Sequence, residues 1–193
     1  WSMRHPGTVL GVGVLVAAAV VLPPVDVPAD YQLGGAYPPP DGVGVLARDW
    51  RESPARGAYS ICYVNGFQTQ PEQRRWWLRV HPDLVLRRDG KPVADPGWPG
   101  ELLLDTRTAR NRRGIARVVG RWIDTCARKG FSAVEADNLD SWTRSHGLLQ
   151  RRDNRLLARL LARRTHAEGL AFAQKNAASL TAVPFFDFAV VEQ

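Results

Sequence analysis

Short apolar runs alternate with longer polar or amphipathic stretches along the chain from Val43 onward. Each run ends in polar residues, and the stretch after it has the pattern of a loop or of a helix with one apolar side. This alternation is typical of a parallel sheet, whose strands are apolar throughout because helices cover them. We expect strands at YQLGG (31–35), GVGVLARD (42–49), AYSICYVN (58–65), ELLLDTR (101–107), FSAVEADN (131–138), LAFAQKN (170–176) and FDFAVVE (186–192).

Two of the intervening segments predict helices. Residues 110–129 and 153–168 each place their apolar side chains on one side of a helix. Gly130 and Gly169 follow these segments directly, at the position where helices often end in a left-handed residue. The segment 87–100 is rich in Pro and Gly, so we expect it to form a hairpin or excursion near a face of the sheet.

These elements predict an α/β fold of the (β/α)8 TIM-barrel type that lacks its last β/α element within this chain. A closed barrel of this type takes eight strands, and the pattern supplies about seven. We expect residues 29–193 to form this one domain. An open doubly wound sheet has the same rhythm of strands and helices and is the structural alternative.

The first residues have the organisation of a secretory signal. Met3, Arg4 and His5 form a short basic start, and an uncharged run follows at 8–22. We interpret residues 1–28 as a signal peptide and linker, so the mature protein is expected to be secreted, without stable membrane association. The alternative is an N-terminal membrane anchor, although the run is shorter than the ~20 apolar residues of a spanning helix.

Secretion permits disulfides, and the chain has two cysteines. Cys62 falls on a predicted strand and Cys126 on a predicted helix, both apolar settings in which a free cysteine packs as a small hydrophobe. Connectivity does not follow from spacing alone. We therefore favour two buried thiols over a disulfide.

The chain is basic, with a formal net charge of +7 and an isoelectric point near 10.1. Such a charge suits nucleic acid or another anionic surface. However, the arginines are scattered along predicted helices and loops, and no nucleic-acid recognition motif accompanies them. We interpret them as solvated helix faces and expect no nucleic-acid partner; the sequence does not indicate an oligomeric state.

Polar side chains gather where the predicted strands end. In parallel sheets these ends lie at one edge, where ligands bind. A single Asp after a strand is often a helix N-cap or turn residue, but five carboxylates at one edge indicate a site. Crowded carboxylates raise one another's pKa, and Lys175 is expected to hold a neighbouring carboxylate ionised, a combination suited to acid-assisted glycoside cleavage. The strand-end residues are Asp49, Asn65, Asp105, Asp137, Asn138, Asp140, Lys175, Asn176 and Glu192.

Other chemistries have less support. The four histidines show no zinc-ligand spacing, and no nucleotide-binding or serine-nucleophile motif follows a strand, so we expect no cofactor and no metal. A divalent cation held by Asp49, Asp105 and Asp137 is the main alternative, because hard cations prefer carboxylate oxygens. Several aromatic residues at strand ends offer stacking surfaces for sugars, with core packing as the alternative for each: Trp50, Tyr63, Phe67, Trp98 and Trp142.

Several motifs, taken in order, resemble glycoside hydrolase family 114, the endo-α-1,4-polygalactosaminidases. They are YQLGGAY, ICYVNGFQ, PGWPGELLLDTR, KGFSAVEADNLDSW, GLAFAQKNA and FDFAVVEQ. The resemblance implies a TIM-barrel domain and a catalytic pair that maps onto Asp137 in VEADN and Glu192 in FAVVEQ. Glu135, on the same strand face as Asp137, is the reserve candidate. Family members continue past the final Glu with another strand and helix, which this chain does not contain.

The resemblance also implies a substrate: a partly deacetylated α-1,4-linked galactosamine polymer. We expect Asp137 to act as nucleophile or base and Glu192 as general acid, with the reverse assignment open. The alternative function is a non-catalytic carbohydrate-binding protein on a barrel scaffold. The residues expected to bind substrate are Asp49, Tyr63, Asn65, Asp105, Glu135, Asn138, Asp140, Trp142, Lys175 and Asn176.

Overall fold

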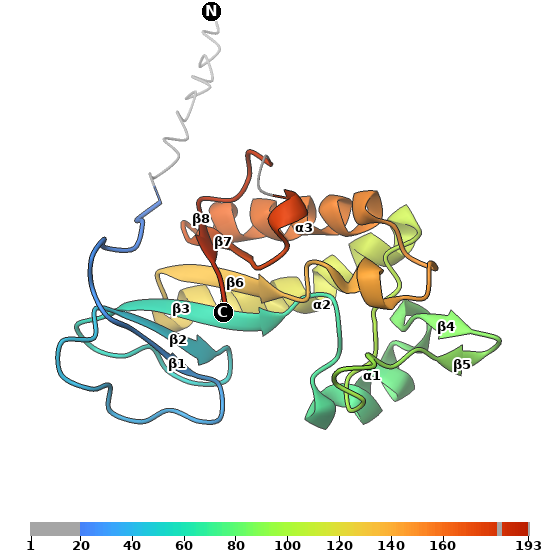
Figure 1. The fold of residues 1–193 in the computed structure, drawn as a ribbon, viewed down its shortest axis with the longest axis horizontal. Coiled ribbons are helices and arrows are strands. Elements are labelled where there is room, and N and C mark those ends of the chain that lie inside the picture. The colour runs from blue at the N-terminus through green and yellow to red at the C-terminus, as the bar shows by residue number, and fades with distance from the viewer. Residues whose placement is uncertain (1–19, 181–182, 193) are drawn as a thin grey trace, which may run out of the picture.

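The computed structural model describes residues 20–180 and 183–192, and it contains a curled sheet of six parallel strands (Figure 1). The strand order β1-β2-β3-β6-β7-β8 follows the chain, so each strand lies beside the next strand of this sheet in sequence. This curled parallel sheet is part of a TIM barrel, so the predicted α/β fold of the TIM-barrel type is confirmed. The strands are β1 (Ala29–Gln32), β2 (Val45–Asp49), β3 (Tyr59–Asn65), β6 (Ala133–Asp137), β7 (Ala171–Lys175) and β8 (Phe188–Val190).

Two long helices, α2 (Ala109–Lys129) and α3 (Arg151–Ala167), lie along one face of the sheet. The predicted helices are confirmed to within two residues at each end. At its start, the Thr108 side chain caps α2 by accepting a hydrogen bond from the Asn111 amide, and α2 ends at Gly130, whose φ is 89°. Shorter elements are η1 (Pro71–Gln73), α1 (Arg74–Val80), η2 (Pro82–Leu84), η3 (Ser141–Arg144) and η4 (Ala178–Leu180).

Side chains alternate between the two faces of each strand, and both faces are apolar. Toward the helices, strand residues such as Val64, Val134 and Phe172 join the main core with the apolar sides of α2 and α3. On the opposite face, Ile61 and Ala133 belong to a second, smaller cluster. Along this second face, polar side chains replace apolar ones toward the strand ends, and there the site begins.

The run ELLLDTR is not a strand of the parallel sheet, which corrects the sequence-based prediction. Leu102, Leu103 and Leu104 make isolated antiparallel bridges within the segment that connects β3 to α2. All three are fully buried, so the run is apolar because loop segments cover it. The same segment contains the small hairpin β4 (Arg87–Arg88) and β5 (Lys91–Pro92), which lies beyond the carboxyl ends of the strands and confirms the predicted excursion.

Cys62 of β3 and Cys126 of α2 form a disulfide, so the expectation of two free thiols is wrong. Both residues point into the core between sheet and helix, where they are fully buried. Their apolar surroundings suit a disulfide as well as a thiol, and only the spatial approach of β3 and α2 distinguishes the two. The bond fixes α2 to the strand that carries Tyr63 and Asn65.

We expect loss of this disulfide to lower the free energy of unfolding substantially. The two cysteines are 64 residues apart, and the loop-entropy model gives about 4 kcal/mol for a crosslink of this span. Urea unfolding of the Cys62→Ala/Cys126→Ala variant measures the change. A reductant should shift the unfolding midpoint of the wild type but not of the variant; an equal response of both would contradict the structural role of the bond.

The proposed signal segment lies largely outside the described residues. Within the described part, the Tyr59 hydroxyl donates a hydrogen bond of 2.7 Å to the carbonyl of Val21, so the chain just before β1 contacts the sheet. None of the helices in residues 20–180 and 183–192 has the length and apolar character needed to cross a membrane.

Candidate active site

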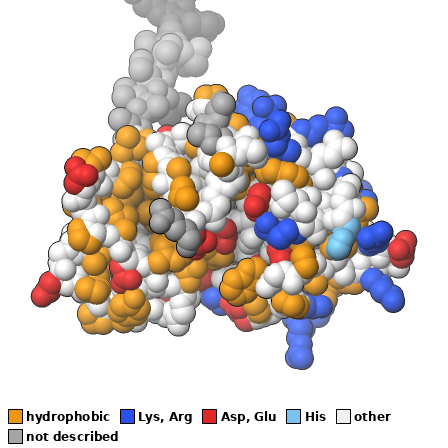
Figure 2. Space-filling view, in the orientation of Figure 1, with side chains coloured by type: hydrophobic (Ala, Val, Ile, Leu, Met, Phe, Trp, Pro, Cys, Tyr) orange, Lys and Arg blue, Asp and Glu red, His pale blue; other side chains and the backbone are white. Residues whose placement is uncertain are grey.

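A cleft of about 680 Å³ opens at the carboxyl ends of the strands. Strand-end residues of β1, β3, β6 and β7, together with Glu192 after β8, line one side. The other side comes from the segment between β3 and α2, including Gln70 and Glu101. In Figure 2, acidic side chains show near the middle of this face, whereas Lys and Arg side chains gather over α3 and around the β4–β5 hairpin.

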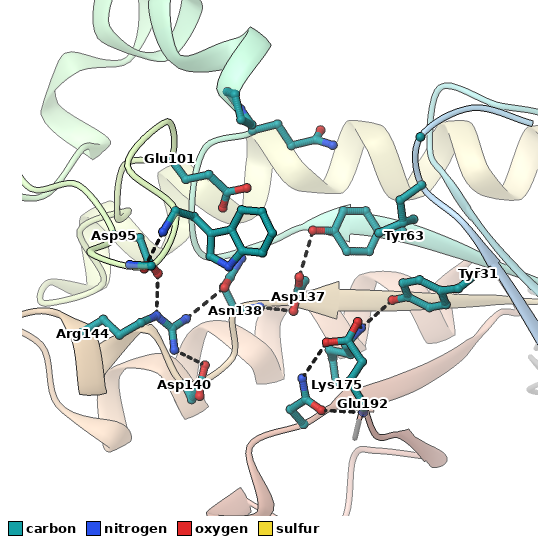
Figure 3. Close-up of a pocket in the computed structure, with 17 residues that line it drawn as sticks. Tyr31, Tyr63, Asp95, Glu101, Asp137, Asn138, Asp140, Arg144, Lys175 and Glu192 are labelled. Atoms are coloured by element: carbon teal, nitrogen blue, oxygen red, sulfur yellow. Dashed lines mark hydrogen bonds and ion pairs between the residues drawn. The ribbon is translucent and has the colours of Figure 1, made fainter.

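Asp137 ends β6 and points into the cleft. Its Oδ2 atom accepts a hydrogen bond of 2.9 Å from the Tyr63 hydroxyl, and its Oδ1 atom accepts one of 2.8 Å from the amide of Asn138 (Figure 3). Burial and the nearby Asp137 carboxylate raise the pKa of Tyr63, so this tyrosine remains a neutral donor. Asn138 has a φ of 64°, a left-handed conformation that asparagine tolerates better than most residues. The turn thus directs an amide at the Asp137 carboxylate.

Lys175, at the end of β7, connects two carboxylates. Its Nζ atom lies 3.1 Å from Glu135 and 2.9 Å from Glu192. It also donates a hydrogen bond of 2.6 Å to the Tyr31 hydroxyl, which in turn donates to Glu135. Lys175 and Glu135 are buried, but the Glu192 side chain is 60% exposed. The buried Lys175–Glu135 pair therefore fixes Lys175 for its second ion pair, with Glu192 at the surface of the cleft.

The protonation states in this network follow from burial and charge. Burial raises the pKa of Glu135, and Lys175 opposes the rise. Burial lowers the pKa of Lys175, but Glu135 and Glu192 outweigh it, so the pKa lies above the usual lysine value. The hydrogen bond from Lys175 lowers the pKa of Glu192. Lys175 is therefore a cation at neutral pH, and Glu192 is a carboxylate.

The profile of glycoside-hydrolase family GH114 matches residues 14–193. The chain belongs to family GH114. The resemblance noted in its motifs is thus confirmed, and the expectation of a glycoside hydrolase is confirmed at the level of the family. No curated protein matches the chain in sequence.

Solved structures show the same fold. Ega3 of Aspergillus fumigatus, in complex with galactosamine, is 22% identical with a TM-score of 0.70 over 91% of this chain and 70% of Ega3. The glycoside hydrolase domain of PelA from Pseudomonas aeruginosa is 13% identical, with a TM-score of 0.55 over 86% of this chain and 66% of that one. An α-galactosidase of Thermus thermophilus, TtGalA, in complex with stachyose, is 17% identical, with a TM-score of 0.53 over 76% of this chain and 36% of that one.

The cleft of this GH114 chain contains most of the residues that the sequence placed at strand ends. Besides the two carboxylates expected to be catalytic, it contains one aromatic residue and several polar residues of the expected binding set. The expected site residues that line the cleft are Tyr63, Asp137, Asn138, Asp140, Lys175, Asn176 and Glu192.

Five expected binding residues do not line the cleft. Asp105 pairs with Arg107 at 2.7 Å, since its run lies outside the parallel sheet. Trp142 packs against the apolar clusters. Glu135 lies beneath Lys175. Asp49 binds Arg51 and the side chain of Gln70, which itself faces the cleft. Asn65 lies behind the cleft wall and is hydrogen-bonded to Glu101 and Asn138. These last three act on the cleft through a neighbour.

The aromatic candidates divide between the core and the cleft. Trp50 stacks on Trp122 with ring centroids 5.3 Å apart, and Phe67 is fully buried, so both are core residues. Tyr63 lines the cleft, as does Trp98, which is 69% exposed.

Three charged residues of the cleft escaped the sequence-based prediction because they lie outside the strands of the sheet: Asp95, Glu101 and Arg144. Arg144 of η3 binds Asp95 at 2.5 Å, Asp140 at 2.9 Å and the side chain of Asn138 at 2.9 Å. It thereby joins the loop after β6 to the loop after β5. Glu101, the third, was visible in the sequence only as the first residue of a predicted strand.

The alternative of a cation site at Asp49, Asp105 and Asp137 finds no support in the geometry. The three carboxylates bind separate partners: Arg51, Arg107 and Tyr63. In the described part of the chain, no group of three or more His, Cys, Asp or Glu side chains is placed to hold a metal ion.

Proposed function

We propose that this GH114 chain cleaves α-1,4-linked galactosamine-containing polysaccharide outside the cell, with Asp137 and Glu192 as its catalytic pair. The observation that carries the proposal is the placement of these two carboxylates in one cleft, at strand ends on either side of β7, in different electrostatic environments. Glycoside hydrolases generally need one carboxyl group as acid and a second as nucleophile or base.

Lys175 distinguishes the two carboxylates. It holds Glu192 ionised, while Asp137 accepts hydrogen bonds from a tyrosine and a backbone amide. An ionised carboxylate suits a nucleophile or base, so a role of Glu192 as general acid requires that substrate displace it from Lys175. The Lys175 contact therefore favours the reverse of the assignment expected from the sequence.

The charge of the cleft supports a cationic substrate. Five carboxylates and two cations line it, although the whole chain carries a net charge of +7. Because charges act mainly within a Debye length of ~8 to 10 Å, this local excess of acid governs which polymer enters. The fold shared with Ega3, whose structure contains galactosamine, supports the same substrate class.

The disulfide supports an extracellular location. Structural disulfides persist in oxidising compartments and are rare in the reducing cytosol. The Cys62–Cys126 bond is buried between sheet and helix and belongs to the core. It agrees with the secretory signal expected at residues 1–28.

We expect the protein to shorten a partly deacetylated α-1,4-galactosamine polymer into oligomers of several sizes, as measured by chromatography and mass spectrometry of the products. Internal cleavage should lower the mean polymer length before monosaccharide accumulates. An α-1,4-galacturonan has the same linkage and the opposite charge, and it should remain intact. Binding of the amino-sugar polymer without shortening would instead support a non-catalytic carbohydrate-binding protein.

A further inference from the structure

The carboxylates of the cleft differ in whether a cation already neutralises them. Arg144 pairs with Asp95 and Asp140, and Lys175 pairs with Glu192. Among the residues that the structure describes, Asp137 and Glu101 line the cleft without a salt bridge to any cation. Asp137 has a place in the proposed chemistry. Glu101 has no such place, and no cation of the described residues neutralises it.

Glu101 is held in a fixed position by its own loop and by β3. Its amide donates a hydrogen bond of 2.8 Å to the carbonyl of Trp98, and its carbonyl accepts one of 3.0 Å from the amide of Asp95. Its Oε2 atom accepts a hydrogen bond of 2.9 Å from the side chain of Asn65. Figure 3 shows Glu101 on the opposite side of Asp137 from the Lys175–Glu192 pair. The carboxylate is therefore preorganised at one end of the cleft.

The surroundings of Glu101 disfavour an uncompensated negative charge. Burial raises its pKa to about 7, the Asn65 hydrogen bond opposes the rise, and the carboxylates of Asp137 and Asp95 add to it. A cation bound beside Glu101 would offset both the burial and the repulsion. A substrate with a positive charge gains most from such a position.

Trp98 provides an apolar surface in the same turn. The Oδ1 atom of Asp95 accepts hydrogen bonds from the amides of Gly97 and Trp98, at 2.8 and 3.3 Å, and so fixes the turn. The Trp98 side chain lines the cleft and is 69% exposed, although tryptophan is usually largely buried. A turn that contributes an exposed indole and a carboxylate to the same cleft suits a ligand that has both an apolar ring face and a cationic group, as a hexosamine does.

We propose that Glu101 and Trp98 form a specificity subsite that recognises the free amino group of a hexosamine unit. The Glu101 carboxylate binds the ammonium group, and the Trp98 indole packs against the sugar ring. An N-acetylated unit has no charge to offer and gains nothing from Glu101. The subsite rests on the proposed function in its substrate class, but it does not depend on which carboxylate performs the cleavage.

The test compares binding of deacetylated and fully N-acetylated α-1,4-galactosamine oligomers by calorimetry, in Asp137→Asn protein so that the ligand stays intact. Glu101→Gln keeps the size of the side chain and can still accept the Asn65 hydrogen bond. We expect it to weaken binding of deacetylated oligomers about 10- to 100-fold, as for loss of a charge-assisted hydrogen bond. Binding of N-acetylated oligomers should remain unchanged.

Glu72→Gln is the matched control, because it is the same substitution at a glutamate that pairs with Arg51 and does not line the cleft. It should leave the preference for deacetylated oligomers intact, whereas Trp98→Ala should weaken both ligands together. Equal effects of Glu101→Gln on the two ligands, or no effect on either, would overturn the proposal. Thermal unfolding of each variant checks its fold. Because the readout is binding, absence of polymer cleavage by the wild type would refute the proposed hydrolysis separately.

Discussion

Replacement of Asp137 by Asn is expected to lower the rate of polymer cleavage on the order of 10²- to 10⁴-fold, the usual contribution of a positioned acid or base. The amide has nearly the shape of the carboxylate and can still accept the hydrogen bonds from Tyr63 and the Asn138 amide. It can neither carry a full negative charge nor give up a proton at neutral pH. The loss should therefore appear in kcat, measured from the release of reducing ends, while the thermal midpoint stays close to that of the wild type.

Asp105→Asn is the matched control for this experiment. Both residues follow apolar runs in the sequence, but Asp105 pairs with Arg107 and does not line the cleft. Its replacement should leave kcat unchanged, and equal rates for the two variants would exclude the assigned role of Asp137. Aryl glycosides extend the comparison to Glu192, since a good leaving group needs no protonation. Of Asp137→Asn and Glu192→Gln, the variant that recovers its rate on the aryl substrate lacks the general acid.

The fold was predictable where burial follows a regular period. The central strands β2, β3, β6 and β7 are buried on both faces, so their apolar runs stand out, and α2 and α3 show the period of a helix with one apolar side. The run around Leu103 has the same composition but is buried by loop segments. An apolar run indicates that a segment is buried, but it does not indicate which other segment its backbone pairs with. This run could therefore not be distinguished from a strand of the sheet.

The candidate site was predictable where it depends on strand alternation. Glu135 and Asp137 lie on the same face of β6, and the polar ends of the neighbouring strands meet there. The loops were not predictable. Glu101 reaches the cleft because the segment between β3 and α2 folds over the strand ends, and Arg144 of η3 meets that segment through its contact with Asp95. The order of residues in the sequence contains no comparable period for them.

Loss of the ion pair between Lys175 and Glu135 is expected to lower the free energy of unfolding substantially. The two side chains are 1% and 0% exposed, and one oxygen of Glu135 has no hydrogen-bond partner. Lys175→Met keeps the length and apolar part of the side chain but removes the charge. It leaves Glu135 buried without a cation, and breaking such a pair on one side typically costs about 3 to 5 kcal/mol. Urea unfolding at pH 7 measures this loss.

The loss of unfolding free energy in Lys175→Met should depend on pH in a direction that identifies a buried charge as its cause. Burial already raises the pKa of Glu135 in the folded protein, and removal of Lys175 takes away the interaction that opposes the rise. A group whose pKa is raised in the folded state stabilises below its unfolded pKa, and this contribution disappears as the pH rises through the folded pKa. The deficit of Lys175→Met should therefore be smaller near pH 4 than at pH 7. A deficit that is constant with pH would indicate lost packing and not a buried charge.

The double variant Lys175→Met/Glu135→Gln completes the test. Glutamine removes the buried charge, so the double variant should regain most of the stability that Lys175→Met loses, and Glu135→Gln alone should be destabilised because Lys175 then lacks its buried partner. This recovery is expected because replacing both members of a buried ion pair removes the desolvation cost together with the attraction. If the double variant is as unstable as Lys175→Met, the ion pair does not account for the loss. Recovery would show that the fold does not need the charged pair, which leaves the contact with Glu192 at the cleft as the role of Lys175 that stability does not explain.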